Sequence, residues 1–431
     1  MSFPRYESYK ETGMEWLGEV PESWQLAKLG FETWVRARLG WKGLKAEEYV
    51  EEGFALLSTP NIKGRTIDFE EVNFISQERY DESPEIKLSE GDVLLAKDGS
   101  TLGIANVIRS LPRPATVNSS IAVVTPLKNL DSVFLYYLLC GTGMQQLIQQ
   151  KKGGMGVPHL FQSDIVKFPI PFPGAIEQRA IASFLDRETA KIDALIAEQQ
   201  RLIELLQEKR QAVISHAVTK GLNPNAPMKD SGVEWLGEVP EHWECLPLKR
   251  YVNNSNAGEV IDKSFWGGSD ELLYTCAIEP LWCDYLGFPE WKRTTEADLL
   301  LTRNGTPYVH RPVPGSIYTN VVQRITLLPG KDREYLSAAL QNSANNLKGY
   351  GVSIESLNYQ MWSTLPVPLP PLEEQASIIK AIKVETSKFD SLLVEVKSGI
   401  QLLQERRSAL ISAAVTGQID VRGLVMEAIE Q

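Results

Sequence analysis

The sequence predicts an α/β (α+β) protein in which two globular domains are separated by two long helices paired as an antiparallel coiled coil. Three observations lead to this prediction: a short segment that occurs twice, a long helical segment that occurs twice, and two unlike domains between the copies. Residues 10–24 and 229–243 are identical at 11 of 15 positions. Residues 177–219 and 374–416 align without a gap and are identical at 21 of 43 positions. Repetition of this kind indicates a duplicated, pseudo-twofold architecture.

The order of the repeats divides the chain into six segments. They are an N-terminal repeat segment (1–24), a first variable domain (25–168), a first long helix region (169–225), a linker repeat segment (226–243), a second variable domain (244–365), and a second long helix region with a C-terminal tail (366–431). Within the first variable domain, short apolar runs predict strands at 55–57, 72–75, 93–96 and 121–124, and a helix at 133–139.

Each long repeat carries apolar residues at steps of three and four, the spacing of one helix face. They are Ile181, Leu185, Ile192, Leu195, Leu202, Leu206 and Val213 in the first copy, and Ile378, Ile382, Phe389, Leu392, Leu403 and Leu410 in the second. Proline-rich approaches at 169–173 and 366–371 stop the helices from growing backward. At 1.5 Å per residue each rod is about 60 Å long, and we expect the two apolar stripes to pack together. Gly399 lies inside the second helix and suggests a kink there.

The bulk composition is that of an ordinary globular protein and permits binding to nucleic acid. The formal net charge is −11, but the two short repeat segments (1–24 and 226–243) carry −3 each, so the larger domains are nearer neutral. No run approaches the roughly 20 apolar residues of a membrane helix, and residues 1–6 show no secretory signal, so we expect a cytoplasmic protein. The four cysteines lack metal-ligand spacing, which predicts free thiols and no metal site.

The motifs that catalysis would require are missing from the sequence. There is no phosphate loop, no His-Glu-x-x-His, and no Asn-Pro-Pro-Tyr-like motif of an amino-methylating enzyme. Asp92 and Lys97 have a nuclease-like spacing, but the second carboxylate of that arrangement is missing just before the lysine, where residues 93–96 are all apolar. The histidines are scattered among separate segments: His159, His216, His242 and His310. We therefore expect no catalytic residue and no cofactor in this chain.

The variable domains instead carry polar loops directly after predicted strands. Residues 97–103 follow one strand and 302–306 follow its counterpart, with Lys97 opposite Arg303 and Gly99 opposite Gly305. Arg and Lys suit guanine, Asn and Gln suit adenine, and Ser and Thr serve either base. The side chains we expect to bind DNA are Arg36, Arg38, Lys42, Lys45, Asn61, Lys63, Arg65, Lys97, Ser100, Thr101 and Asn118 in the first domain, and Arg303, Asn304, Thr306, Tyr308, His310, Arg311, Asn320, Gln323 and Arg324 in the second.

Taken together, these features resemble the specificity (S) subunit of type I restriction–modification systems. The resemblance covers nearly the whole chain. It is carried by the repeat Gly-(Met/Val)-Glu-Trp-Leu-Gly-Glu-Val-Pro-Glu-x-Trp at 13–24 and 232–243, by the Pro-x-Pro…Glu-Gln approaches to both helices, and by the helix exits at 405–411 and 414–420.

The resemblance implies a division of labour between this chain and its partners. Each variable domain would be a target-recognition domain for one half of a bipartite double-stranded DNA site. The paired helices would set the spacer and dock two methyltransferase (modification) subunits. Those partners would carry S-adenosylmethionine, and restriction (translocase/nuclease) subunits would add ATP- and Mg-dependent translocation and cleavage.

Two other function classes remain open on the sequence. A coiled-coil protein scaffold would use the same rods without binding a specific DNA sequence. An autonomous DNA-modifying enzyme would have to act on DNA as a purified chain. A mobility-shift selection on random duplexes, with and without methyltransferase subunits, separates these classes from a specificity subunit.

The missing cofactor motifs predict that the isolated chain neither methylates nor cleaves DNA. Pure protein incubated with labelled S-adenosylmethionine and random duplexes should transfer no label above background. Reproducible incorporation without a partner subunit would contradict this prediction.

Overall fold

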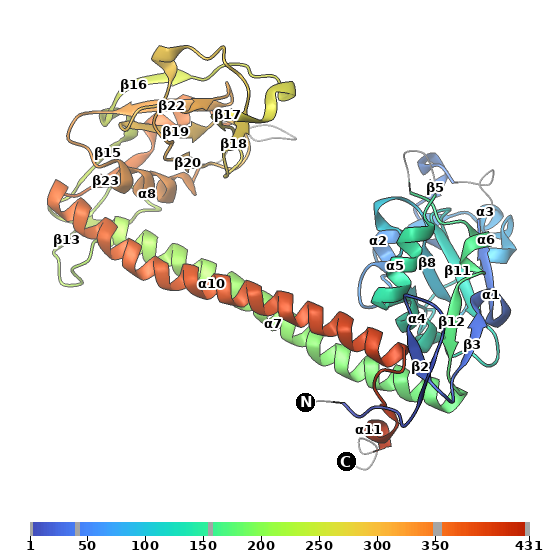
Figure 1. The fold of residues 1–431 in the computed structure, drawn as a ribbon. Coiled ribbons are helices and arrows are strands. Elements are labelled where there is room, and N and C mark those ends of the chain that lie inside the picture. Colours follow the sequence, from blue (N-terminus) through green and yellow to red (C-terminus); the bar gives the residue numbers. More distant parts are fainter. Residues whose placement is uncertain (1–2, 39–43, 154–157, 348–355, 427–431) are drawn as a thin grey trace. The chain divides into compact units, whose positions relative to one another are not determined.

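The computed structural model describes residues 3–38, 44–153, 158–347 and 356–426. The chain divides into two compact units: unit 1 comprises residues 1–199 and 398–431, and unit 2 comprises residues 200–397. Both boundaries fall inside long helices, so each unit holds one globular domain and half of each helix (Figure 1). Within the described residues, no helix has the length and apolar character needed to cross a membrane.

The domain of unit 1 is built from two four-stranded sheets. One sheet has the order β4-β11-β8-β9 and the other β10-β6-β7-β5. The bounds are β4 Thr33–Ala37, β5 Tyr49–Val50, β6 Phe54–Leu57, β7 Asn73–Ile75, β8 Val93–Ala96, β9 Ala105–Val107, β10 Ala115–Val117 and β11 Ile121–Pro126. Strand β8 is buried on both faces, with Val93 and Leu95 in one core and Leu94 and Ala96 in another. This explains why the sequence shows a continuous apolar run there, and the predicted strands are confirmed.

The domain of unit 2 repeats this layout with different side chains. Its sheets have the orders β16-β22-β19-β20 and β18-β17-β21. The bounds are β16 Val252–Ala257, β17 Trp266–Tyr274, β18 Leu281–Cys283, β19 Asp298–Thr302, β20 Val309–His310, β21 Ile317–Tyr318 and β22 Val322–Leu327. The buried helices α4 (Ser132–Cys140) and α8 (Arg333–Ala344) occupy corresponding places, and α4 confirms the helix predicted at 133–139.

Short ribbons and helices complete each unit. The two-stranded ribbons are β1 (Tyr9–Glu11) with β2 (Glu19–Pro21), β3 (Gln25–Lys28) with β12 (Pro169–Phe172), β13 (Met228–Asp230) with β14 (Glu238–Pro240), and β15 (Glu244–Pro247) with β23 (Pro366–Leu369). The short helices include α1 Leu29–Glu32, α2 Thr59–Ile62, α3 Gln77–Asp81, α5 Thr142–Lys151, α6 Gln162–Ile165, α9 Tyr359–Thr364 and α11 Arg422–Met426. Because β3 pairs with β12 and β15 with β23, the chain enters and leaves each domain at neighbouring points.

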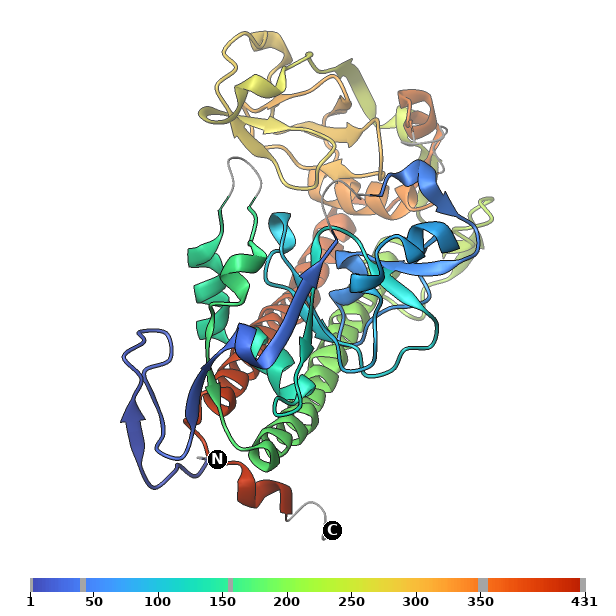
Figure 2. The ribbon, with the colours of Figure 1, turned by 90° about the vertical axis from the view of Figure 1, so that its right-hand side faces the viewer.

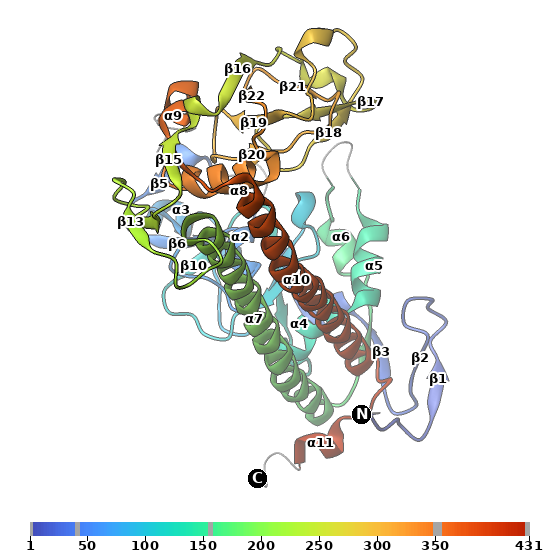
Figure 3. The same ribbon diagram turned by 90° about the vertical axis from the view of Figure 1, so that its left-hand side faces the viewer.

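The long helices α7 (Ala175–Lys220) and α10 (Leu372–Val415) run side by side and antiparallel (Figure 1 and Figure 3). In unit 1, Arg407 Nε donates to Asp193 Oδ1 at 2.8 Å, and in unit 2 Arg210 Nε donates to Asp390 Oδ1 at 2.9 Å. In the repeat alignment Asp193 corresponds to Asp390 and Arg210 corresponds to Arg407, so the two ion pairs are equivalent. Each helix supplies the aspartate of one pair and the arginine of the other. The predicted antiparallel pairing is confirmed, and α10 continues as one helix through Gly399.

The predicted apolar stripe is buried at some positions and exposed at others. The buried positions are Ile181, Leu185, Ile192 and Leu206 in α7, and Ile378, Ile382 and Leu410 in α10. Ile181 and Leu185 pack with Leu410 in the core of unit 1. By contrast, Leu195, Leu202 and Leu392 near the helix centres are exposed, so the apolar seam between the helices is interrupted there. The ends are buried because a globular domain packs on them in addition to the other helix.

The short repeats pack against the ends of the long helices. Trp24 and Trp243 are both fully buried. A Cβ atom at Gly417, just after α10, would lie 3.1 Å from the indole of Trp24, and one at Gly221, just after α7, would lie 3.2 Å from Trp243. Both glycines have positive φ angles, 74° and 75°, so they end the helices and admit the tryptophans. Figure 2 shows the N-terminal hairpin beside the end of α10.

A fragment of residues 1–225 should dimerise through α7. The core of unit 1 needs apolar side chains that α10 supplies, among them Leu410, Ile411, Ala414 and Val415. The fragment lacks them, but a second copy offers Val213, Ile214, Ala217 and Val218 at the matching repeat positions. Exposed apolar surface favours this pairing by about 25 cal/mol per Å² buried. Sedimentation should show a dimer at micromolar concentration, and a strict monomer would contradict the pairing.

Arg210→Glu is the matched variant for that fragment. In the dimer, Arg210 would face Asp193 of the other copy, as Arg407 does in the intact chain. Reversing its charge should weaken dimerisation several-fold, since a partly exposed ion pair contributes up to about 1 kcal/mol. Adding Asp193→Arg should restore it.

Candidate functional site

The ends of several strands meet at one edge of the first domain. Strands β6 and β10 run parallel and both end there, and the Asn118 amide donates to the Leu57 carbonyl oxygen at 2.9 Å. Strand β8 ends beside the start of β11, where the Lys97 amide donates to the Ser120 carbonyl oxygen at 2.8 Å. The loops that follow these strands are therefore gathered on one side of the domain.

We call residues 97–101, 118–120 and 158–161 the first strand-end edge. The last segment joins it because the Leu160 amide donates to the Lys97 carbonyl oxygen at 2.8 Å. The edge brings together four of the side chains expected to bind DNA: Lys97, Ser100, Thr101 and Asn118.

Two further polar residues belong to this edge, although the sequence did not single them out. One carboxylate oxygen of Asp98 forms an ion pair with Lys97 Nζ at 3.1 Å. The other carboxylate oxygen contacts Nδ1 of His159. The His159 ring lies edge-on to exposed Phe161, with centroids 4.5 Å apart. Asp98 could have been noticed from its place beside Lys97, whereas His159 lies far away in sequence and only the fold brings it here.

The second domain has an edge with the same backbone. We call residues 303–308, 319–321 and 356–357 the second strand-end edge. Its Arg303 amide donates to Val321 at 2.9 Å, and the Arg303 carbonyl accepts from Leu357 at 2.7 Å, as Lys97 does with Ser120 and Leu160. Gly99 and Gly305 have φ angles of 72° and 73°. The predicted correspondence of the two loops is confirmed.

The second edge carries different side chains from the first. The expected residues gathered there are Arg303, Asn304, Thr306, Tyr308 and Asn320. Arg303 Nη1 donates to the Asn320 carbonyl oxygen at 3.1 Å, which orients the guanidinium along the edge. A cavity of about 460 Å³ adjoins the loop and is lined by Asn304, Thr306 and Tyr308 among others.

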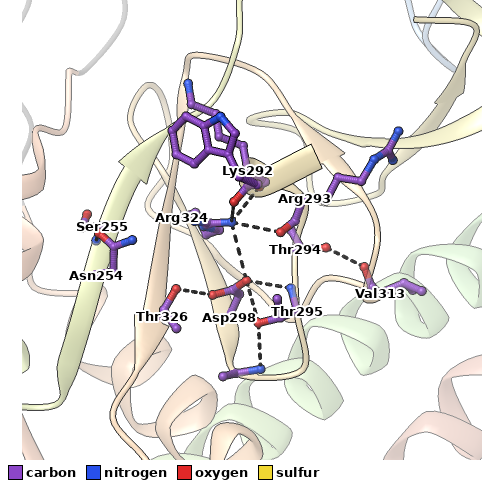
Figure 4. Close-up of polar contacts among 12 residues, drawn as sticks. Asn254, Ser255, Lys292, Arg293, Thr294, Thr295, Asp298, Val313, Arg324 and Thr326 are labelled. Atoms are coloured by element: carbon purple, nitrogen blue, oxygen red, sulfur yellow. Dashed lines mark hydrogen bonds and ion pairs between the residues drawn. The ribbon is translucent and has the colours of Figure 1, made fainter. Parts of the chain in front are cut away.

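Two of the expected arginines are buried in structural ion pairs. Arg36 Nη2 lies 2.9 Å from Asp92 Oδ2 beneath the first sheet. Arg324 Nη1 donates to the carbonyl oxygens of Lys292 at 2.7 Å and Arg293 at 2.9 Å, and lies 4.0 Å from Asp298 Oδ2 (Figure 4). Both carboxylates are buried, and a nearby cation offsets part of the cost of burying their charge. These arginines therefore stabilise the domains, and direct DNA contact by either would require those bonds to break.

Three other expected residues are also buried and internally bonded. Arg38 donates to Ser83 Oγ at 3.2 Å, and burial lowers the pKa of its guanidinium from the ordinary value. Asn61 accepts from the Ser58 amide at 2.9 Å and so caps the start of α2. Gln323 Nε2 donates to Ser255 Oγ at 2.6 Å. Their assignment to DNA binding stays a prediction.

Several other expected residues in the described part of the chain lie outside the two edges. Exposed examples are Lys45, Lys63, Arg65 and Arg311. Arg311 Nη1 is 3.1 Å from Glu334 Oε1, so part of its charge is neutralised. Lys42 falls outside the described residues.

His310 is held uncharged in the interior of the second domain. It is 3% exposed, and its ring lies edge-on to Tyr274 and Tyr308, with centroids 5.3 and 4.7 Å away. Burial lowers the pKa of His310 to about 4. It therefore carries no positive charge for a phosphate group at neutral pH.

All four cysteines are free thiols. Across the described ranges, no group of three or more His, Cys, Asp or Glu side chains is placed to hold a metal ion.

Comparison with known proteins gives one consistent family. Residues 48–205 match the protein-family model described as type I restriction modification DNA specificity domain. The chain is 23% identical to the type I restriction enzyme MjaVIII specificity subunit of Methanocaldococcus jannaschii, over 98% of this chain and 99% of that protein. It is 20% identical to the EcoKI specificity subunit of Escherichia coli, over 93% of this chain and 90% of that protein.

A solved structure has the same fold. A chain from a type I restriction–modification system superimposes with a TM-score of 0.67 at 15% identity, covering 92% of this chain and 98% of that one.

The buried, neutral His310 predicts a loss of stability in acid. Between pH 6.5 and 4 the unfolded chain protonates this histidine and the folded chain does not, so folding stability falls as the pH drops through this range. The depressed pKa corresponds to about 3 kcal/mol at the acid end. In urea unfolding, His310→Gln should lose less stability between pH 7 and 4 than the wild-type chain. His216→Gln, at an exposed position of α7, should behave as wild type, and equal pH dependence of all three would contradict the assignment.

Proposed function

We propose that this chain is a type I restriction enzyme specificity subunit, like the proteins it is similar to, and that it selects the DNA sequence on which partner subunits act. One observation carries the proposal: the two strand-end edges share a backbone and differ in side chains. A reader of two unlike half-sites needs this combination, because the scaffold fixes the geometry and the side chains choose the bases.

The side chains at the two edges suit different base edges. At the second edge, Arg303 fits the paired acceptors of guanine and Asn304 fits adenine. At the first edge, Lys97 is only 8% exposed and is paired with Asp98. Base contacts there would therefore come from Ser100 and Thr101, which serve either base, and from Asn118, which suits adenine. The two domains would therefore recognise the two halves of a bipartite site independently.

The paired helices would dock two methyltransferase subunits and set the distance between the half-sites. Support comes from the exposed leucines near the helix centres, Leu195, Leu202 and Leu392, which leave apolar surface uncovered. Because the repeat supplies similar surfaces twice, two copies of one partner could bind. Restriction subunits could join the same assembly.

The partner subunits would catalyse methyl transfer and DNA cleavage. S-adenosylmethionine, ATP and Mg would be bound by the methyltransferase and restriction subunits, and this chain would act without a cofactor of its own in the cytoplasm. Its contribution to the reaction would be to hold the methyltransferase over the correct base.

Selection from random duplexes tests the proposal. The full chain with its methyltransferase subunits should enrich two short conserved blocks at a fixed spacing. A protein scaffold would enrich no sequence, and an autonomous enzyme would modify DNA without partners.

Arg303→Ala should change recognition in one half-site only. A good base contact contributes about 1–3 kcal/mol, so affinity for the selected site should fall roughly 5- to 150-fold, with relaxed base preference at one position. Competition binding against single-base variants of both half-sites would measure this. Arg201→Ala, on the exposed face of α7, is the control, and an equal loss for every DNA sequence would identify Arg303 as a phosphate contact.

A further inference from the structure

A Pro-Glu-x-Lys turn precedes the central strand in both domains. In the first domain it forms η3 (Pro84–Ile86), and in the second it forms η7 (Glu290–Lys292), which follows Pro289. The third residue of the turn is Ile86 in one copy and Trp291 in the other. Ile86 is 0% exposed within the core, whereas Trp291 is 67% exposed. A large aromatic side chain thus stands in solvent where its counterpart is buried.

An arginine anchors the turn in each domain. Arg36 Nη2 donates to the Lys87 carbonyl oxygen at 3.4 Å, and Arg324 Nη1 donates to the Lys292 carbonyl oxygen at 2.7 Å. In the second domain the same nitrogen also binds Arg293 and lies near buried Asp298 (Figure 4). The backbone that carries Trp291 is therefore fixed from inside the domain, so its exposure is not the result of a loose loop.

Trp291 is connected to the second strand-end edge by a short chain of contacts. Lys292 Nζ lies 5.4 Å from the Trp291 ring centroid and forms an ion pair with Glu259. The Glu259 carbonyl accepts from the Asn320 amide at 2.8 Å, and the Asn320 carbonyl accepts from Arg303 at 3.1 Å. The turn that carries the exposed indole is thus linked to the second strand-end edge through Lys292 and Glu259.

We propose that Trp291 packs against the DNA as a wedge beside the half-site of the second domain and partly unstacks the adjacent base step. This inference rests on the proposed DNA-reading function. Apolar side chains inserted between base steps are a known means of bending DNA, and Trp291 is a large, exposed side chain on a backbone that is held in place. A methyltransferase docking site is less consistent, because two copies of that partner would need matching surfaces and Ile86 in the first domain is buried.

The test uses the full chain assembled with its methyltransferase subunits and selected duplexes that carry 2-aminopurine at single positions in or beside each half-site. Wild-type protein should raise 2-aminopurine fluorescence at one step beside the second half-site. Trp291→Ala should abolish that increase and weaken DNA binding by about five- to a hundredfold, as for loss of one stacking aromatic side chain. Trp291→Phe should keep most of both effects.

Trp282→Ala is the matched control. Trp282 lies on β18 and is 53% exposed, and its removal should leave DNA affinity and fluorescence unchanged. If Trp291→Ala binds DNA as wild type does, or if it weakens assembly with the methyltransferase in the absence of DNA, the inference is overturned. If the wild-type complex selects no DNA sequence, the proposed function itself has failed.

Arg324 acts in this proposal as a positioning residue. Arg324→Lys should weaken DNA binding when Trp291 is present, because lysine cannot bridge the carbonyl oxygens of the turn. In the Trp291→Ala background the same substitution should have little further effect on DNA affinity. An equal loss in both backgrounds would show that Arg324 only stabilises the domain.

Discussion

The antiparallel pairing of α7 with α10 is the constraint on which the rest of the structure depends. Asp193 with Arg407 and Asp390 with Arg210 form equivalent ion pairs at the two halves of the helix pair. Around them, each globular core takes apolar side chains from both helices. Neither domain can therefore complete its core from one helix alone, and the far ends of the sequence are required to fold a single unit.

Within each domain, a buried carboxylate sets a second requirement. Asp92 and Asp298 lie just before and at the start of the equivalent strands β8 and β19, and each needs a cation in the interior. The first domain supplies Arg36 from β4 and the second supplies Arg324 from β22. The arginine near the buried carboxylate thus comes from a different strand in each domain. The loops at the far ends of β8 and β19 nevertheless have the same backbone geometry.

That separation between scaffold and surface fits a protein that must vary what it recognises. Under the proposed function, substitutions at the strand-end edges would change which hydrogen bonds are offered to DNA and would leave the buried strands intact. Exposed residues such as Trp291 can add to recognition in one domain without a counterpart in the other. The repeats at the helix ends, by contrast, are constrained by close packing between Trp24 and Gly417 and between Trp243 and Gly221.

The sequence by itself determined the duplication, the two long helices and the matched loops at Lys97 and Arg303, because these depend on local pattern and on comparison of the chain with itself. It could not determine which polar residues face solvent. Arg36 and Arg324 look like surface cations in sequence, yet distant carboxylates hold them inside. His159 reaches Asp98, and Lys292 beside Trp291 reaches Glu259, only through contacts between remote segments. The tertiary structure decided these points because burial and ion pairing depend on strands that are far apart along the chain.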